Sequence, residues 1–474
     1  SHMSGLPYNE RDIVSIFDYS KHLIDKCLRD FVPDAGEYRG KGGLGQLVEE
    51  HYFKYGVNSR QAADFAFVNT ELKCTPLKRA ADGELLIKER LVCSMINYAE
   101  DWNKSFEESH IYKKCLMMLI LFYLHGKNTP KLDLKFIFSV LWRIQDKDLL
   151  IIRNDYETII SKIRDGKAHD LSEGDTMYLG ACRKGQKGDS LMAQHDSPVR
   201  APRRAWSLKA AYMRIILDEV KKNNVDGAYS NVGIRASSSG LKPLFTFREL
   251  SDSSVDEILL KRFAPYVGKT YEDICRCLGT APETSKSRYF NIANKIAGNA
   301  AVGNVNRTEE FRKSGLTMKT VRVRQTGVVK ESMSFENIDY QEVFDCNDWV
   351  DFRLYELFTS RFLLVVFRET DQDDKNAGKL YGEEYRLDKV AFWTMPSADL
   401  NVARDYWQNI RKCVLENHID SKHFWSMGDD RYFHVRPKAR VADDMTENPN
   451  GGMAKKYCYW FNARYVRNII DNEI

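Results

Sequence analysis

The sequence lacks the cysteine spacing of a zinc site and any hydrophobic run long enough to cross a membrane. Its ten cysteines form no CxxC pair, and the close pair Cys275 and Cys277 has no second pair to complete four ligands. Free thiols of this kind are typical of a reducing compartment. The longest apolar run, Cys115 to Leu124, has ten residues, about half of a membrane crossing. No signal-peptide pattern stands at the N-terminus, so we expect a cytoplasmic protein with no membrane partner.

The chain also has little net charge, +4 over 474 residues, so overall charge does not indicate a nucleic-acid partner. The distribution of charge is more informative. The segments Arg183 to Lys209 and Arg307 to Lys330 each hold seven basic and two acidic residues, an excess of five. Two basic stretches suit a polyanion bound along two lobes. Each could equally be a solvated surface, which is the common reason for a charge cluster.

The length favours two domains, because single cores stop growing at about 250 to 300 residues. Residues 1–3 (Ser-His-Met) resemble a protease-site remnant and are excluded from the fold. The segment from Asn223 to Pro243 is rich in Asn, Gly and Ser. We therefore place a linker at 223–249, between a first domain at 4–222 and a second at 250–474.

The two halves carry a faint internal repeat in the same order. KERLVCSMINY ends at Tyr98 and KESMSFENIDY ends at Tyr340, each ten residues after its first lysine. An apolar strand-like run follows in both halves, then RNDY ending at Tyr156 and ARDY ending at Tyr406. Apolar residues at helical spacing predict a helix from Asp155 to Arg164. Helical and β-rich runs alternate in each half, which predicts an α/β or α+β fold with a mixed sheet, used twice.

The stretch DFAFVNTELKCT carries the candidate chemistry. Alternation from Val68 onward predicts a strand on which Glu71 and Lys73 point the same way, anchored in the core by Leu72. Asp64 lies across a turn and can meet Glu71 at a shared Mg²⁺, since this hard ion prefers oxygen ligands. Lys73 can orient or deprotonate the attacking water. The triad alone is weak, because such residues near a strand are more often a surface charge cluster.

Neighbouring motifs strengthen the triad. Upstream, KGGLGQLVEE opens a helix, and downstream FEESHIYKK leads into the apolar strand. In this order the motifs resemble the MutH-type mismatch-repair nickases and their relatives, the type II restriction endonucleases that cut at GATC. The resemblance implies two tandem PD-(D/E)XK domains and a Mg²⁺-dependent bacterial enzyme. It also implies hydrolysis of double-stranded 5′-GATC-3′ on the 5′ side of the G, leaving 5′-phosphate ends.

The resemblance further implies a cognate DNA methyltransferase as functional partner, and leaves open a monomer in solution or a dimer on DNA. It assigns site roles residue by residue. The expected metal ligands are Asp64, Glu71, Glu49 and the backbone carbonyl of Leu72. Helical periodicity alone did not separate Glu49 from Glu50. Lys73 matches the catalytic lysine, and Lys114 is expected to contact a backbone phosphate near the cut. His110 is more often structural and receives no role.

Base reading in this family uses an R-P-K-A loop, whose place is taken here by YLGACRKG. Lys184 matches the lysine, which can donate to guanine in the major groove. Ser207 stands where the nickase carries a recognition tyrosine, and its role is open. The DNA-contacting residues expected from the resemblance are Lys41, Lys184, Arg183, Lys187, Ser207, Lys209, Arg436 and Lys438.

The second half keeps the reading loop but not the acids. The sequence RPKA starting at Arg436 matches the pattern in full. Asn294 and Thr317 replace two of the three acids, and Glu310, aligned with Asp64, is the acid retained. We expect an inactive lobe that binds its own GATC site as an allosteric effector, although the lobe could instead be only a scaffold. Two alternatives for the whole chain are a mismatch-repair nickase and a DNA-binding protein that does not cut.

Overall fold

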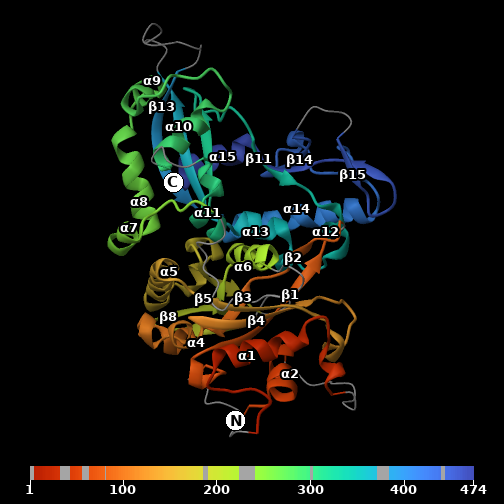
Figure 1. Cartoon of the computed structure of the whole chain (residues 1–474). Coiled ribbons are helices and arrows are strands. Elements are labelled where there is room, and N and C mark those ends of the chain that lie inside the picture. The colour runs from red at the N-terminus through yellow and green to blue at the C-terminus, as the bar shows by residue number, and fades with distance from the viewer. Residues whose placement is uncertain are drawn as a thin grey trace. The chain divides into compact units, whose positions relative to one another are not determined.

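The computed structural model describes residues 5–32, 43–55, 63–80, 82–184, 190–223, 241–298, 303–370, 384–438 and 444–474. The chain divides into two compact units (Figure 1). Unit 1 comprises Ser1–Pro243 with Arg312–Ser314, and unit 2 comprises Leu244–Phe311 with Gly315–Ile474. Two expected DNA contacts, Lys41 and Lys187, lie outside the described residues, as does most of the expected linker.

The main sheet of unit 1 has the strand order β2-β1-β4-β5. β1 (Glu71–Arg79) runs parallel to β4 (Met117–Leu124), while β2 (Leu85–Ile87) and β5 (Phe136–Arg143) are antiparallel to their neighbours. The side chains from Met118 to Phe122 are fully buried. The ten-residue apolar run of the sequence is therefore a central strand covered on both faces.

A second, antiparallel sheet in unit 1 has the order β3-β9-β6. Its strands are β3 (Leu91–Met95), β9 (Arg204–Leu208) and β6 (Leu179–Arg183), and a hairpin of β7 (Leu191–Gln194) and β8 (Ser197–Pro202) precedes β9. The α-helices described in this unit are α1 (Ile13–Ser20), α2 (Leu44–Val48), α3 (Tyr98–Asp101), α4 (His110–Lys114), α5 (Asp146–Arg164) and α6 (Ala210–Asn223).

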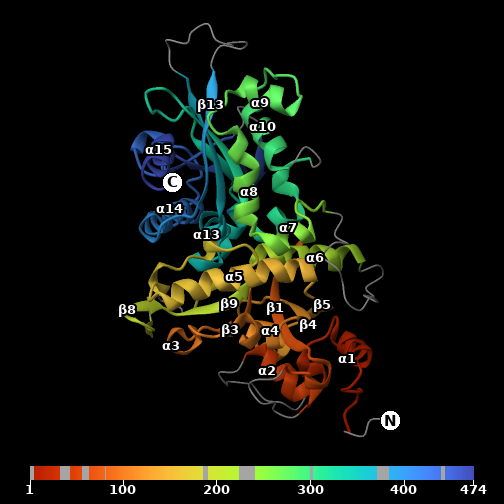
Figure 2. The same cartoon turned by 90° about the vertical axis from the view of Figure 1, so that its left-hand side faces the viewer.

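Helix α5 contains the helix expected from Asp155 to Arg164 and runs across the strands of unit 1 (Figure 2). The apolar positions that predicted it, Tyr156 to Ile163, are buried at the expected spacing. The helix begins earlier, at Asp146, because acidic residues in its first turn complement the helix dipole. Across the described ranges, neither α5 nor any other helix is long and apolar enough to span a membrane.

Unit 2 repeats this arrangement. Its main sheet has the order β10-β12-β13, with β10 parallel to β12, and its second sheet has the antiparallel order β11-β17-β14. The strands are β10 (Thr317–Val323), β11 (Met333–Asn337), β12 (Phe362–Glu369), β13 (Tyr385–Trp393), β14 (Phe433–Arg436), β15 (Met445–Glu447), β16 (Met453–Lys455) and β17 (Cys458–Phe461). The mixed α/β architecture expected from the sequence is confirmed.

The helices described in unit 2 are α7 (Phe247–Asp252), α8 (Val255–Phe263), α9 (Tyr271–Leu278), α10 (Arg288–Ala297), α11 (Glu309–Ser314, shared with unit 1), α12 (Tyr340–Asp345), α13 (Arg353–Thr359), α14 (Ser397–Leu415) and α15 (Ala463–Asn472). α14 and α5 have the same length, 19 residues, and carry the ARDY and RNDY motifs. Residues 244–249, which the sequence placed in the linker, belong to unit 2.

The landmark tyrosines of the internal repeat occupy equivalent positions. Tyr98 opens α3 in unit 1 and Tyr340 opens α12 in unit 2. Both rings are buried. The Tyr98 hydroxyl donates to the carbonyl of Pro202, and the Tyr340 hydroxyl donates to that of Lys455 at 2.6 Å. Each tyrosine thus ties its helix to the end of a hairpin strand, which explains why the repeat keeps it.

One boundary differs from the sequence expectation. A strand was expected from Val68, but 66–68 is a single 3₁₀ turn and β1 begins at Glu71. Asn69 adopts a left-handed conformation (φ 46°), and Phe65 and Thr70 pair across the turn. The turn is not visible in the sequence, because the alternation of side chains that begins at Val68 continues without a break from the turn into β1.

Candidate active site

A turn brings Asp64 and Glu71 together at the start of β1. The Asp64 backbone N–H donates to Oε1 of Glu71 at 3.0 Å, and the Leu72 N–H donates to Oδ2 of Asp64 at 2.9 Å. These two hydrogen bonds flank the bridge between Phe65 and Thr70 and fix both carboxylates. The seven-residue spacing in the sequence is therefore the length of this turn.

Glu49 reaches the same place from a separate element. It begins a short π-helical turn, Glu49–Phe53, directly after α2. Burial raises the pKa of Glu49 to about 7, and both the negative charge of Asp64 and a hydrogen bond with it add to the shift. Three carboxyl groups from two parts of the sequence therefore meet.

Carboxyl groups crowded in this way favour a bound cation. Glu71 is 6% exposed, and its burial, followed by the hydrogen bond and charge of Asp64, raises its pKa to about 9. Carboxylates that are desolvated and close together ionise together only when positive charge is nearby. Their oxygen atoms are the ligands that hard divalent ions such as Mg²⁺ prefer. The donor set thus fits a divalent metal ion.

Lys73 lies two positions after Glu71 on β1, and its Nζ donates to the carbonyl of Cys93 at 3.0 Å. Burial lowers the pKa of Lys73, but negative charge on Cys115 and Cys93 and on the two carboxyl groups raises it more, so it lies above the ordinary lysine value. The ammonium group is therefore charged at neutral pH. It is suited to donate a hydrogen bond to a water or a phosphate oxygen, and poorly suited to accept a proton.

Lys114 is the last residue of α4 and directly precedes Cys115, a neighbour of Lys73. Ser109 caps this helix, since its hydroxyl accepts a backbone N–H of the first turn. The next residue, Cys115, is buried, and its thiol acts on the pKa of Lys73. Burial lowers the pKa of His110, the first residue of α4. A neutral His110 adds no charge here.

Asp155, which sequence analysis missed, anchors the start of β6. Its carboxylate accepts the backbone N–H groups of residues 177, 178 and 179 at 2.8, 2.7 and 3.0 Å. Burial raises the pKa of Asp155 to about 6, although the three N–H donors favour the ionised form. A signal was present in the sequence. Asp155 stands four residues from both Ile151 and Ile159, on the apolar face of α5, where a carboxylate needs partners.

The strand that Asp155 anchors ends at Arg183 and leads to Lys184, the expected base-reading lysine. The Lys184 side chain is exposed, and its backbone N–H donates to the carbonyl of Arg203 at 2.9 Å. The carbonyl of Arg183 accepts a hydrogen bond from the guanidinium of Arg90 at 3.1 Å. The backbone on both sides of the sheet end is therefore held, while the lysine side chain is accessible.

Ser207 and Lys209 lie beside this strand. Ser207 is 2% exposed, and its hydroxyl donates to the carbonyl of Gly180 at 3.4 Å. The Lys209 ammonium group donates to the carbonyl of Thr176, and its stem passes Gly180, where an added Cβ would lie 3.6 Å from Lys209 Cε. Both side chains hold the loop in this conformation. Ser207, expected among the DNA contacts, has almost no surface to offer a base.

β10 of unit 2 corresponds to β1 of unit 1. Each runs parallel to the central strand of its sheet. Lys319 Nζ donates to the carbonyl of Ser334 in β11 at 2.8 Å, as Lys73 Nζ donates to a carbonyl of β3. By this register Thr317, an uncharged residue, stands where Glu71 stands in unit 1. The lysine of the site is kept in unit 2 and this acid is not.

Asn306, rather than Glu310, takes the place of Asp64. Spacing alone aligned Glu310 with Asp64. In the structure the Met318 N–H donates to Oδ1 of Asn306 at 2.7 Å, and the Leu72 N–H makes the same bond to Asp64 in unit 1. The alignment was wrong because α11 lengthens the connection that leads to the strand. The interval is eleven positions from Asn306 to Thr317 in unit 2 and seven from Asp64 to Glu71 in unit 1.

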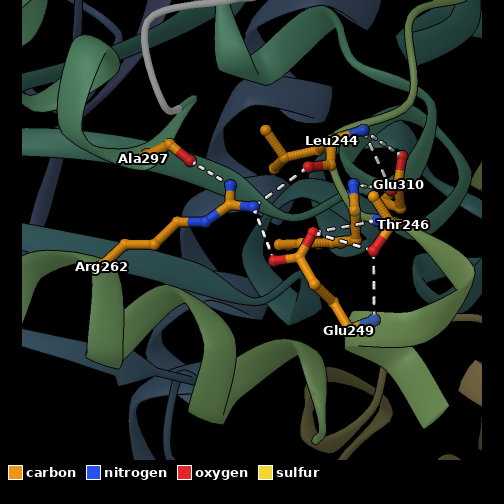
Figure 3. A network of polar contacts seen from close by, with 7 residues as sticks. Leu244, Thr246, Glu249, Arg262, Ala297 and Glu310 are labelled. Atoms are coloured by element: carbon orange, nitrogen blue, oxygen red, sulfur yellow. Dashed lines mark hydrogen bonds and ion pairs between the residues drawn. The ribbon is translucent and has the colours of Figure 1, made fainter. Parts of the chain in front are cut away.

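Figure 3 shows the different role of Glu310. The residue is fully buried and accepts the backbone N–H groups of Leu244 at 3.0 Å and Phe245 at 2.8 Å. Arg262 donates to the carbonyls of Leu244 at 3.2 Å and Ala297 at 2.6 Å. Glu310 thus fastens the start of unit 2. Asn306 and Thr317, the counterparts of Asp64 and Glu71, hold no carboxylate, and neither does Asn294, which the sequence repeat aligns with Glu49.

The expected reading loop of unit 2 starts at Arg436, the last residue of β14. Arg436 pairs with Cys458 of β17, as Cys182 pairs with Ala205 of β9 in unit 1. The two residues therefore occupy equivalent positions in their sheets. Its guanidinium lies 3.9 Å from the centre of the Trp460 ring, and its Nε is buried with no hydrogen-bond partner among the described residues. Lys438 is exposed. The loop therefore presents one stacked and one exposed cation.

Comparison with known proteins adds relatives for both units. Residues 53–155 match the family model for MutH, a DNA mismatch repair enzyme. The chain is 29% identical over 476 residues to the type II restriction enzyme Sau3AI of Staphylococcus aureus, which covers 94% of this chain and 92% of that protein. It is 26% identical over 183 residues to the DNA mismatch repair protein MutH of Shewanella amazonensis, covering 38% of this chain and 79% of that protein. The similarity to the restriction enzyme thus runs through both units.

Proposed function

We propose that this chain, a MutH-like restriction enzyme and hence a site-specific deoxyribonuclease, cleaves double-stranded DNA at 5′-GATC-3′ in the presence of Mg²⁺. Cleavage falls on the 5′ side of the G and leaves 5′-phosphate ends, as the family resemblance implies. The observation that carries the proposal is the meeting of Glu49, Asp64 and Glu71 beside Lys73.

In this proposal Asp64, Glu71, Glu49 and the backbone carbonyl of Leu72 would hold the metal ion. Bound Mg²⁺ supplies positive charge that polarises the scissile phosphate and offsets the charge developing during in-line attack. Lys73 donates a hydrogen bond that orients the attacking water or a phosphate oxygen, in line with its raised pKa. Lys114 neutralises a neighbouring phosphate. Both lysines act where charge builds up in the transition state.

DNA contacts in unit 1 centre on the end of β6. Lys184 is exposed on a backbone held from both sides, and a lysine there can donate to guanine O6 and N7 in the major groove. Arg183 would contact the adjoining backbone phosphates. Lys41, Lys187 and Lys209 remain proposed DNA contacts. For Ser207, burial favours support of the loop over contact with DNA.

Unit 2 would bind a second GATC duplex and raise cleavage by unit 1. Support comes from the combination of a site that lacks the carboxylates of the candidate metal site in unit 1 and a loop that presents Arg436 and Lys438. A lobe that only supported its neighbour would have no need of two cations at this loop. The alternative of a mismatch-repair nickase is disfavoured because the MutH relative covers 38% of this chain, whereas the restriction enzyme covers 94%.

The family resemblance implies a cognate DNA methyltransferase that protects the host sites, so we include this partner in the proposal. The proposed location is the bacterial cytoplasm. The enzyme would act as a monomer in solution, or as a dimer on DNA. The deciding experiment is digestion of plasmid carrying GATC sites, methylated and unmethylated, with Mg²⁺ and with EDTA. Cleavage at GATC in Mg²⁺ but not EDTA is expected. Intact plasmid in every arm would favour a binding protein that does not cut.

A further inference from the structure

A cavity of about 280 Å³ opens in unit 2 where the candidate active site lies in unit 1. Asn306, Met318 and Lys319, the counterparts of Asp64, Leu72 and Lys73, line its wall. The cavity therefore lies at the position in unit 2 that is equivalent to the candidate active site of unit 1.

The charge of this cavity is opposite to that of the centre in unit 1. Its wall carries four cations against one carboxylate, from Lys286, Lys319, Arg322, Lys330 and Glu331. The carboxylate of Glu331 is largely exposed and already pairs with Arg322 at 3.2 Å. A net excess of three positive charges repels a divalent metal ion and attracts an anion.

Lys319 is the cation of this cavity that corresponds to Lys73 of unit 1. Its Nζ donates to the carbonyl of Ser334 and lies 5.0 Å from the centre of the Phe335 ring, which leaves an ammonium group with further hydrogen atoms to donate. Burial, with added repulsion from the ammonium group of Lys438, lowers the pKa of Lys319 to about 8. An anion beside it would relieve both effects.

We propose that this cavity binds one phosphodiester group of duplex DNA directly through Lys319, without a metal ion. This rests on the proposed function of unit 2 as a second DNA site. Lys438 lies close enough to act on Lys319, so a duplex read by the loop at Arg436 can place a backbone phosphate in the cavity. In unit 1 a metal ion must separate carboxylates from phosphate. In unit 2 amines replace the metal, so the DNA is held and not cut.

The first test is protection of Lys319 from a lysine-acylating reagent, mapped by mass spectrometry on the full chain in EDTA. A short GATC duplex should lower labelling of Lys319 severalfold. Lys261, exposed on α8 of the same unit, should keep its labelling. Millimolar inorganic phosphate is the second arm. Protection by phosphate alone, with no effect of duplex, would assign the cavity to a free anion and overturn the DNA proposal.

The second test uses Lys319→Met, which keeps the length of the side chain, and Lys261→Met as the matched control. With a slow one-site substrate, Lys319→Met should raise the concentration of uncleavable duplex needed for half-maximal stimulation about ten-fold, as for one lost charged hydrogen bond. It should also lower the salt dependence of binding. The slope of the logarithm of that concentration against the logarithm of salt concentration should fall by about one, the value of one phosphate contact. Lys261→Met should change neither.

The outcomes separate this inference from the proposed function. Stimulation of the wild-type chain with no protection of Lys319 would leave unit 2 as a DNA site and overturn the phosphate cavity. Protection of Lys319 in EDTA without stimulation would support the cavity and refute the effector role. Protection that requires Mg²⁺ would contradict a metal-free site, and the absence of both effects would refute both proposals.

Discussion

Replacing Asp155 with alanine should destabilise unit 1 and loosen the strand that leads to Lys184. The Asp155 side chain, in a residue 1% exposed, accepts three backbone N–H groups at 2.7 to 3.0 Å. Hydrogen bonds to a charged group contribute about 1.5 to 3 kcal/mol each, or roughly 4.5 to 9 kcal/mol for three. Burial opposes this strongly enough to raise the pKa from 3.8 to about 6 even though the N–H donors lower it, which costs the ionised form about 3 kcal/mol at 1.36 kcal/mol per unit. The net loss of unfolding free energy is about 1.5 to 6 kcal/mol.

Asp405 provides the matched control, because it precedes Tyr406 in α14 as Asp155 precedes Tyr156 in α5 and is exposed. Asp405→Ala should change the unfolding free energy by less than about 0.5 kcal/mol. Urea denaturation at pH 7, followed by fluorescence, measures both variants. A loss below about 1 kcal/mol in Asp155→Ala, within the range of an ordinary surface change, would refute the reasoning, as would equal losses in the two variants.

The same residue gives stability a pH dependence of defined sign. The folded pKa of Asp155 lies above its unfolded value, so the folded state binds more protons between about pH 4 and 6. The extra stability that comes from this raised pKa is therefore greatest below this window and is lost as the pH rises through it, whereas the three N–H bonds to the carboxylate persist at pH 7. Asp155→Asn lacks this term. The stability difference between wild type and Asp155→Asn should thus shrink from pH 4 to pH 7. A difference that grows over this range would contradict a raised pKa for the buried Asp155 carboxyl group.

Three further outcomes are expected. Lys184→Ala should weaken binding to GATC DNA by about 1 to 3 kcal/mol and to unrelated DNA much less, whereas equal losses in a competition assay would make it a phosphate contact. DNA with two GATC sites should be cut severalfold faster than DNA with one, a coupling of about 1 to 3 kcal/mol. A short uncleavable GATC duplex added to the one-site DNA should raise its cleavage rate. Lys438→Ala should abolish the difference in rate between the two substrates. Identical rates on both substrates, with and without the duplex, would remove the effector role. Effector affinity should fall as the pH rises above 8, by up to about ten-fold per unit, because Lys319 loses its proton there; affinity in Lys319→Met that falls equally would exclude this lysine as the cause.

Local spacing in the sequence was sufficient where a single turn determines the geometry. The interval between Asp64 and Glu71 placed the two carboxylates on one turn because two backbone hydrogen bonds close it. The duplicated fold was also predictable, since Tyr98 and Tyr340 perform the same packing task. These features depend on neighbours close in sequence or on a motif that occurs twice.

Features that depend on distant contacts were not predictable in the same way. The alignment of Glu310 with Asp64 failed because α11 inserts residues before β10, and only the backbone contacts identify Asn306 as the counterpart. The burial of Ser207 follows from its pairing between β3 and β6, which no local pattern reports. Asp155 was within reach, but its partners lie 22 to 24 residues away.

The most direct test of the central claim is cleavage and binding of one GATC duplex by the wild-type chain, Asp64→Ala and Glu71→Ala, with Glu50→Ala as a neighbouring control. Removing either carboxylate should cost several kcal/mol of transition-state stabilisation, a rate loss of about a thousand-fold or more. Affinity for the duplex, measured in EDTA, should be retained, because the repulsion between carboxylate and phosphate is reduced. Glu50→Ala should cut at the wild-type rate. Substantial cleavage by both Asp64→Ala and Glu71→Ala would contradict the assignment of the active site.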